Sequence, residues 1–257
     1  MGVQGFLFLC DMELGRLEDK KKVKMKHGEY VDRSPKSVRH PSITSDIYLQ
    51  LSAISEDIES HAHFAKGRLL DIGAGKAPYK PFFSKFITEY VTFDSASTPE
   101  CPVDIVGDAQ KMPVKGNSFD TVFSSQTLEH IPYPQKVIDE IYRVLKPGGV
   151  CILTTHMANP LHGMPHDYFR FTKQAFRFVL FKDFEVITIK ENGGALLSIA
   201  QFIVWGFSYS LPKWLSLPII IPVNWLAKRL DKRFFNDIFT TNYIVVARKP
   251  LTARRSK

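Results

Sequence analysis

The 257-residue chain is predicted to fold as a doubly wound α/β domain, whose mainly parallel sheet is covered by helices on both faces. Short apolar segments rich in branched residues alternate with longer segments whose apolar residues recur at helical spacing. This alternation favours right-handed crossovers between parallel strands. With 44% hydrophobic and 23% charged residues, the chain has an ordinary composition for a protein that buries a full α/β core.

Each expected element has its own local signal. A helix is expected over residues 45–64, because apolar residues recur every three or four positions from Ile47 to Ala62. The segment 133–145 has the same spacing, and Pro147-Gly148-Gly149 follows it as a stop signal. Strands are expected at residues 68–72, 90–94, 103–106, 119–124, 150–154 and 243–247.

The first expected strand runs into the turn Asp71-Ile72-Gly73-Ala74-Gly75. Glycines at this place let the backbone turn tightly and approach a ligand closely. In doubly wound sheets, ligands lie beyond the carboxyl ends of the strands, where the winding reverses. No Gly-Lys-Ser/Thr follows, which excludes a phosphate-binding Walker loop, whereas Ala77 stands where a dinucleotide turn has its third glycine. The turn alone therefore does not identify its ligand.

Asp94 ends the second expected strand and follows Asp71 at the spacing typical of an acid that binds a ribose. A carboxylate suits this role because it can accept hydrogen bonds from both ribose hydroxyls at once. Such an acid serves a dinucleotide or another nucleoside cofactor equally well.

Four further stretches decide between these cofactors. They are Gly107 to Pro113, Asn117 to Val122, Leu128-Glu129-His130, and Arg143-Val144-Leu145-Lys146-Pro147-Gly148-Gly149. Together with the glycine turn, from about Arg68 to Thr155, this ordered series closely resembles the class I S-adenosylmethionine (SAM)-dependent methyltransferases of the type 11-like group. The resemblance implies a Rossmann-like sheet of seven strands and SAM as the cofactor.

The resemblance also implies roles for seven positions. Asp71, Gly73 and Gly75 would line the methionine half of SAM, Asp94 would hold the ribose, Asp108 and Ala109 would border the adenine, and Gln126 would lie beside the cofactor after the fourth strand. The chemistry agrees, because SAM carries a diol, an amino acid group and a sulfonium but no phosphate. Such a site needs acids and a close backbone rather than a basic cradle.

Candidates for acceptor chemistry follow the fifth expected strand, between Thr155 and Thr172. His156, His166 and Tyr168 are the candidate catalytic residues, since a base is needed where the acceptor holds a proton at neutral pH. The stretch from His166 to Arg170 resembles one that some members of the group carry beside the acceptor pocket. Two interpretations carry equal weight here: His166 acts as the base, or the loop is a hydrogen-bonded lid without a proton role.

No metal site is expected from the sequence. His162 and His166 have the spacing of metal ligands on a helix, but Gly163 and Pro165 between them argue against a helix. The three cysteines, Cys10, Cys101 and Cys151, lie far apart and form no CxxC pair or Cys/His cluster. This cysteine usage favours a cytoplasmic location.

The segment from Gly193 to Ala227 is unusually apolar and holds one charge, Lys213. Pro212, Pro218 and Pro222 are expected to cut it into short pieces, none long enough to span a membrane. Two interpretations remain: peripheral contact with an anionic membrane, or a buried insertion that caps an apolar acceptor pocket. We favour contact with the inner face of the membrane, because four basic residues follow this segment: Lys228, Arg229, Lys232 and Arg233.

The expected organisation has four parts: a basic, flexible lead-in (1–41), a SAM-binding core (42–192), the apolar insertion (193–235), and a last strand with a basic tail (236–257). The net charge of +8 is concentrated in the lead-in and tail, which suits an anionic surface or simply two solvated ends.

The leading hypothesis is an oxygen-directed methyltransferase acting on a small, lipid-linked or membrane-proximal acceptor such as a glycan precursor or a quinone. Nucleic-acid methylation is less favoured, because Ser124-Ser125-Gln126-Thr127 stands where an Asn/Asp-Pro-Pro-aromatic motif would be. A SAM-fold binding protein without turnover is the third hypothesis, although the three acids Asp71, Asp94 and Asp108 argue against it.

Overall fold

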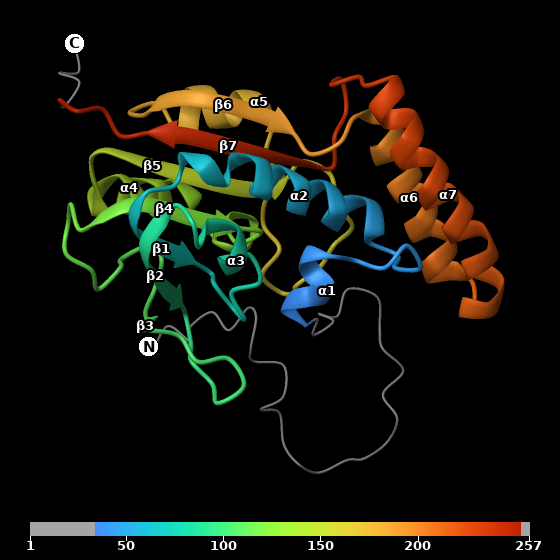
Figure 1. Ribbon diagram of the computed structural model, residues 1–257, viewed down its shortest axis with the longest axis horizontal. Coiled ribbons are helices and arrows are strands. Elements are labelled where there is room, and N and C mark those ends of the chain that lie inside the picture. The colour runs from blue at the N-terminus through green and yellow to red at the C-terminus, as the bar shows by residue number, and fades with distance from the viewer. Residues whose placement is uncertain (1–33, 253–257) are drawn as a thin grey trace.

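A seven-stranded sheet with the order β3-β2-β1-β4-β5-β7-β6 forms the centre of the computed structural model, which describes residues 34–252 (Figure 1). The strands are β1 (Gly67–Ile72), β2 (Ile87–Asp94), β3 (Ile105–Val106), β4 (Phe119–Ser125), β5 (Leu145–His156), β6 (Glu185–Glu191) and β7 (Asn242–Arg248). β7 pairs antiparallel with β5 and β6, and the other pairs are parallel. The predicted doubly wound, mainly parallel sheet is therefore confirmed.

Helices cover both faces of this sheet (Figure 1). They are α1 (Pro35–Arg39), α2 (Tyr48–His61), α3 (Lys80–Phe83), α4 (Pro134–Val144), α5 (Lys173–Ala175), α6 (Ala195–Ser210) and α7 (Lys213–Arg233), with short helical turns η1 (Ala62–Phe64), η2 (Leu128–His130) and η3 (Phe176–Leu180). Leu69 packs in the cluster that contains α2, whereas Leu70 packs in the cluster that contains α4. Consecutive strand residues point to opposite faces, so strands covered on both sides are apolar throughout.

The winding of the sheet reverses between β1 and β4. From this point β2 and β3 continue on one side, and β5, β7 and β6 on the other. The carboxyl ends of β1, β2 and β4 therefore meet at one edge, which is where open α/β sheets bind ligands. The glycine turn, Asp94 and the residues after β4 all lie at this edge.

The region around β5 differs from the expectation. Helix α4 ends at Val144, but Pro147-Gly148-Gly149 lies within β5 and is not a separate turn before it. The backbone N–H of Gly148 donates to Lys249 O, and the N–H of Lys249 donates to Gly149 O, both at 2.9 Å. Pairing with the chain beyond β7 thus extends the strand through residues that usually break one.

The apolar segment also differs from the expectation, because its prolines do not divide it. α6 and α7 form a helical hairpin, and α7 runs without a break through Pro218 and Pro222. Each proline removes one helical hydrogen bond, but the inner face of α7 is held by tertiary contacts, including Asn224 Nδ2 donating to Ile43 O at 2.8 Å. Among residues 34–252, no helix combines the length and apolarity needed to cross a membrane.

Only the end of the expected lead-in falls among the described residues. There α1 is capped by the side chain of Ser34, and Val38 O accepts a hydrogen bond from Ser55 Oγ of α2 at 3.2 Å. The lysine-rich segment before residue 34 and the basic residues after 252 lie outside the described part of the chain, so the predictions made for them stay predictions.

Candidate functional site

The glycine turn is pinned to the end of β2. The backbone N–H groups of Gly73 and Ala74 donate to Phe93 O at 2.9 and 3.1 Å, and that of Gly75 donates to Asp94 Oδ2 at 3.0 Å. Gly73 has φ +71°, and a Cβ there would lie 2.2 Å from Thr127 Oγ1. Only glycine fits this position, and the turn offers bare backbone to whatever lies beyond the strand.

Ala77, which replaces the third small residue of a dinucleotide turn, also adopts a left-handed conformation, with φ 45°. Its N–H donates to Ala74 O at 2.7 Å, which closes the loop. A non-glycine residue at positive φ stores strain that the surrounding contacts must offset. The loop therefore has a defined shape.

Asp71 is buried at the end of β1, and the hydroxyl of Tyr90 donates to its Oδ2 at 2.6 Å. Burial raises the pKa of Asp71 to about 7; the bond from Tyr90 opposes this rise, and the nearby charge of Asp94 adds to it. Tyr90 was not among the residues expected at the site. Its side chain reaches Asp71 only because the two strands pair with Leu69 opposite Tyr90.

Asp94 lies beside Asp71 at the end of β2, and each of its oxygens accepts a backbone hydrogen bond. Gly75 N–H donates to Oδ2 at 3.0 Å, and Ser95 N–H donates to Oδ1 at 2.7 Å. Burial raises the pKa of Asp94, although these N–H groups favour the ionised form and oppose the shift. The carboxylate thus connects the glycine turn to the loop after β2.

Asp108 and Ala109 follow β3, and the structure brings them to the same edge. Gly107 N–H donates to Asp94 O at 3.0 Å, which fixes the start of their loop next to β2. The carboxylate of Asp108 is exposed and accepts from the backbone N–H of Gln110 at 2.8 Å. Ala109 packs partly against the core.

Gln126 follows β4 with φ 55°, and its side chain extends toward β5 and β7. Its amide Nε2 donates to Thr154 Oγ1 at 2.9 Å and to Asn242 Oδ1 at 3.2 Å. The amide oxygen is buried and accepts no hydrogen bond from the described residues. Gln126 therefore connects the end of β4 with β5 and β7.

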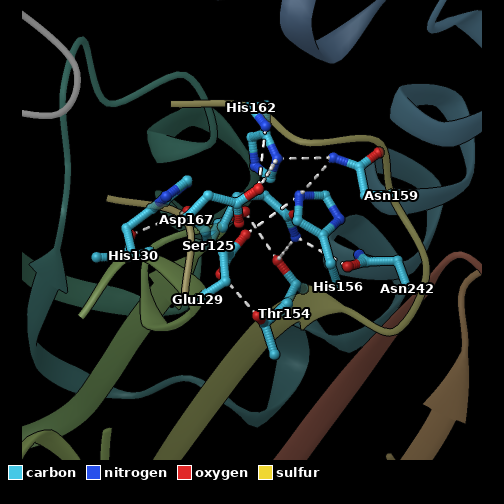
Figure 2. Close-up of polar contacts among 12 residues, drawn as sticks. Ser125, Glu129, His130, Thr154, His156, Asn159, His162, Asp167 and Asn242 are labelled. Carbon is cyan, nitrogen blue, oxygen red and sulfur yellow. Dashed lines mark hydrogen bonds and ion pairs between the residues drawn. The ribbon is translucent and has the colours of Figure 1, made fainter. Parts of the chain in front are cut away.

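Three imidazoles gather around the buried side chain of Glu129 (Figure 2). His156 Nε2 lies 3.2 Å from Glu129 Oε1, and the ring centroids of His156 and His130 each lie 4.8 Å from that of His162. Burial lowers the pKa of His156 well below its usual value, and the neighbouring His162 and Arg170 lower it further. Burial likewise lowers the pKa of His162. Both rings are therefore neutral near pH 7.

His166 and Tyr168 form a separate pair, with His166 Nδ1 2.8 Å from the Tyr168 hydroxyl. The tyrosine is exposed, and residues 162–166 form a turn rather than a helix. The three candidate catalytic residues are thus not brought together: His156 lies inside the buried group, and the other two lie on the loop. Glu129 was not among the candidate site residues, yet its carboxylate lies at the centre of the buried group.

The loop itself is held firmly against η2. The backbone N–H groups of Tyr168 and Phe169 donate to Glu129 O at 3.0 and 3.2 Å. Asp167 accepts from Arg170 at 2.6 Å, and the same guanidinium donates to Asn159 O. This network orders both ends of the loop, so its histidines have defined positions.

A polar chain also connects this group with the helical hairpin. Gln50 of α2 donates from Nε2 to His156 Nδ1 at 3.2 Å, and its backbone N–H donates to Gln201 Oε1 of α6 at 3.1 Å. α2 therefore lies between the hairpin and the histidine group.

The central part of the chain is similar to known methyltransferases. A family described as "Methyltransferase domain" matches residues 70–153. A curated relative, the ubiquinone biosynthesis O-methyltransferase of Nitrosococcus oceani, is 26% identical over a segment covering 47% of this chain and 63% of the relative. The match thus spans less than two thirds of that relative's length.

Solved structures show the same fold at low sequence identity. The [4+2]-cyclase SpnF superposes with a TM-score of 0.53 at 19% identity, over 80% of this chain and 83% of the cyclase. A SAM-dependent methyltransferase from Mesorhizobium loti superposes with a TM-score of 0.51 at 15% identity, over 78% of this chain and 99% of that protein. Because the cyclase shares the fold, the fold alone does not define the reaction.

Proposed function

We propose that this chain, a member of the class I SAM-dependent methyltransferases, transfers a methyl group from SAM to an oxygen atom of a small apolar acceptor. The observation that carries the proposal is the pair of buried acids, Asp71 and Asp94, at adjoining strand ends beside a pinned glycine turn. The matched methyltransferase family covers this turn and both acids.

The residues at the strand ends fit SAM. Its ammonium and sulfonium are cationic and its ribose carries two hydroxyls, so buried carboxylates and bare backbone are complementary to it. A Cβ at Gly73 would overlap the side chain of Thr127, so the turn keeps a bare backbone there, and Gln126 has an unpaired buried amide oxygen among the described residues. When bound, SAM supplies an electrophilic methyl group, and the chain's task is to orient the acceptor oxygen in line with it.

The raised pKa of Asp71 leads to a pH prediction. Below about pH 7 the carboxyl of the free protein is protonated, whereas a bound cation favours the carboxylate, so SAM competes with a proton. SAM affinity is therefore expected to rise with pH, by about tenfold between pH 6 and pH 7.5. Calorimetry over this range, in buffers of different ionisation enthalpy, measures both the affinity and the proton released.

The matched control for this prediction is Asp71→Asn, which keeps the shape and removes the titration. Its SAM affinity should be low and nearly independent of pH. A wild-type affinity that does not change with pH, or an equal slope in the variant, would contradict a role for Asp71 beside the cofactor.

We propose a quinone or a lipid-linked glycan precursor as the acceptor. The matched relative from Nitrosococcus oceani is named for ubiquinone biosynthesis, which supports an apolar, oxygen-bearing acceptor. The histidine-rich loop, with His166 and Tyr168, lies at the ligand edge of the sheet and would border such an acceptor. His166 is the candidate base because it is paired with Tyr168 outside the buried group, while the lowered pKa of His156 makes that ring a weak base.

The function is tested in two steps. Calorimetry should detect binding of SAM and none of NAD, and a lipid extract incubated with the protein and methyl-labelled SAM should yield a labelled product by mass spectrometry. His166→Gln should then lower the rate at saturating SAM by 10²-fold or more, as expected for loss of a general base. Binding of NAD without SAM would overturn the cofactor assignment, and an unchanged rate would remove His166 from the chemistry.

We also propose that the α6–α7 hairpin contacts the headgroup region of an anionic membrane. Several of its polar side chains face the protein: Gln201 Nε2 donates to Asp46 O at 2.6 Å, and Asp231 accepts from Gly194 N at 2.9 Å. Its outer face exposes apolar side chains, namely Leu196, Ile199, Phe202, Ile203, Phe207, Trp214, Leu215, Ile221, Trp225, Leu226 and Leu230. A helix that faces water has a polar outer face instead.

Charge favours a lipid surface as the occupant of this face. Lys232 and Arg233 are exposed at the end of α7, and the Arg229 guanidinium lies 3.7 Å from the centre of the Trp225 ring. Exposed tryptophans with basic residues at one end of an apolar face are typical of helices that lie in the interface of an anionic leaflet. The hairpin starts just after β6, at the ligand edge, so a docked membrane would lie near the acceptor loop (Figure 1).

A further inference from the structure

Glu129 is fully buried, yet one of its carboxylate oxygens has no aligned donor. Oε2 accepts from Thr155 Oγ1 at 2.6 Å, whereas Oε1 accepts no hydrogen bond from the described residues. His156 Nε2 lies 3.2 Å from Oε1 without the alignment of a hydrogen bond. A buried carboxylate oxygen without a partner is costly unless a cation or donor compensates for it.

The rings next to Glu129 are oriented as metal-binding histidines are. One ligand atom each of Glu129, His130 and His162 lie within 4.8 Å of one another. His130 Nδ1 donates to His166 O at 2.8 Å, and His162 Nδ1 lies 3.1 Å from Pro160 O. A histidine that binds a metal through one nitrogen usually donates the other N–H to a carbonyl or carboxylate, which fixes the ring.

Asp167 adds a second feature of such sites. Its Oδ2 lies 3.4 Å from His162 Nδ1 and accepts the His162 backbone N–H at 3.0 Å. The carboxylate therefore contacts both the ring and the backbone N–H of His162. Arg170 in turn binds Asp167, so the charge of this outer carboxylate is already balanced.

We propose that Glu129, His130 and His162 bind one divalent transition-metal ion. Two imidazoles and one carboxylate suit Zn²⁺, Mn²⁺ or Fe²⁺, whereas Mg²⁺ and Ca²⁺ prefer sites made of oxygen atoms. Ligands at about 2.1 Å from a tetrahedral ion lie roughly 3.4 Å apart, so the widest of the three separations, at most 4.8 Å, closes by up to about 1.4 Å when the group binds the ion. This proposal does not depend on methyl transfer, because it concerns the binding of the ion alone.

The sequence did not indicate this site because its parts are far apart along the chain. Glu129 and His130 follow β4, and His162 belongs to the loop after β5. The parallel pairing of β4 with β5 brings the two segments to one edge. In the sequence, His162 has ligand spacing with His166, but in the structure the ring of His166 pairs with Tyr168 instead.

The test measures metal uptake directly. Full-length protein is treated with a chelator, dialysed and titrated with Zn²⁺ against a competing chromophoric indicator, and with Mn²⁺ by electron paramagnetic resonance. One equivalent of metal per chain is expected. Glu129→Gln and His162→Gln should each weaken binding by more than tenfold, because even the loss of an outer-shell partner costs about that much. His162 is partly exposed, so its variant should fold.

His63→Ala is the matched control, because His63 is exposed and lies outside the group. This variant should bind the metal as the wild type does. Near-ultraviolet circular dichroism and SAM binding, measured on the same samples, report folding and cofactor binding separately. Folded wild-type protein that takes up neither ion, or variants that bind like the wild type, would overturn the proposal, whether or not SAM binds.

Discussion

Replacing Asp94 by alanine is expected to raise the Kd for SAM by 100-fold or more. The substitution removes both acceptors for the N–H groups of Gly75 and Ser95, and with them the carboxylate proposed to bind the ribose. Hydrogen bonds to a charged group contribute about 1.5 to 3 kcal/mol each. Loss of the two proposed bonds from the ribose hydroxyls to Asp94 therefore corresponds to a decrease in SAM affinity on the order of 100-fold or more. Isothermal titration with SAM and with S-adenosylhomocysteine measures the effect.

Two further variants serve as a control and as a conservative replacement. Asp139→Asn removes an exposed acid on α4, far from the strand ends, and should bind SAM normally. Asp94→Asn keeps the size of the side chain but presents an NH₂ group to one of two N–H donors. Its Kd for SAM should therefore be close to that of the alanine variant. Binding within threefold of the wild type in both Asp94 variants would mean that the cofactor lies elsewhere.

The strands and the larger helices near this site could be predicted because their signals are local. Leu69 and Leu70 are both buried, as expected for a strand covered on both faces, and the spacing from Ile54 to Ile58 marks the inner face of α2. The glycine turn was predictable for a similar reason, since Gly73 follows a strand directly and no other residue fits its backbone conformation.

Other features depend on contacts between distant segments and have no local signal. Tyr90 reaches Asp71 only through the register of β1 and β2, and Glu129 meets His162 only through the pairing of β4 and β5. The prolines of α7 predict interruptions from local stereochemistry, but tertiary hydrogen bonds to Asn224 and Asp231 hold the helix in one piece. Functional sites are where distant contacts most often override local preference.

Replacing Trp214 and Trp225 together by serine is expected to weaken binding to anionic vesicles strongly. Both side chains are exposed on α7, by 73% and 50%. Moving two such side chains into an interface contributes about 3 kcal/mol, so the double variant should bind vesicles on the order of 100-fold more weakly. The measurement is flotation of the protein with phosphatidylglycerol-containing vesicles at low salt, with the bound fraction followed as lipid concentration rises.

The charge contribution is tested apart from the apolar one. Lys232→Glu with Arg233→Glu should weaken binding mainly at low salt, because each basic residue near an anionic surface contributes about 1 kcal/mol that salt screens. A control pair, Phe178→Ser with Val179→Ser, removes equally exposed apolar side chains from η3 and should leave flotation unchanged. Wild-type protein that stays at the bottom of the gradient would refute membrane contact. A stable dimer that the tryptophan variants dissociate would instead assign the hairpin to a second copy of the chain, because an exposed apolar face of this extent is typical of an interaction site.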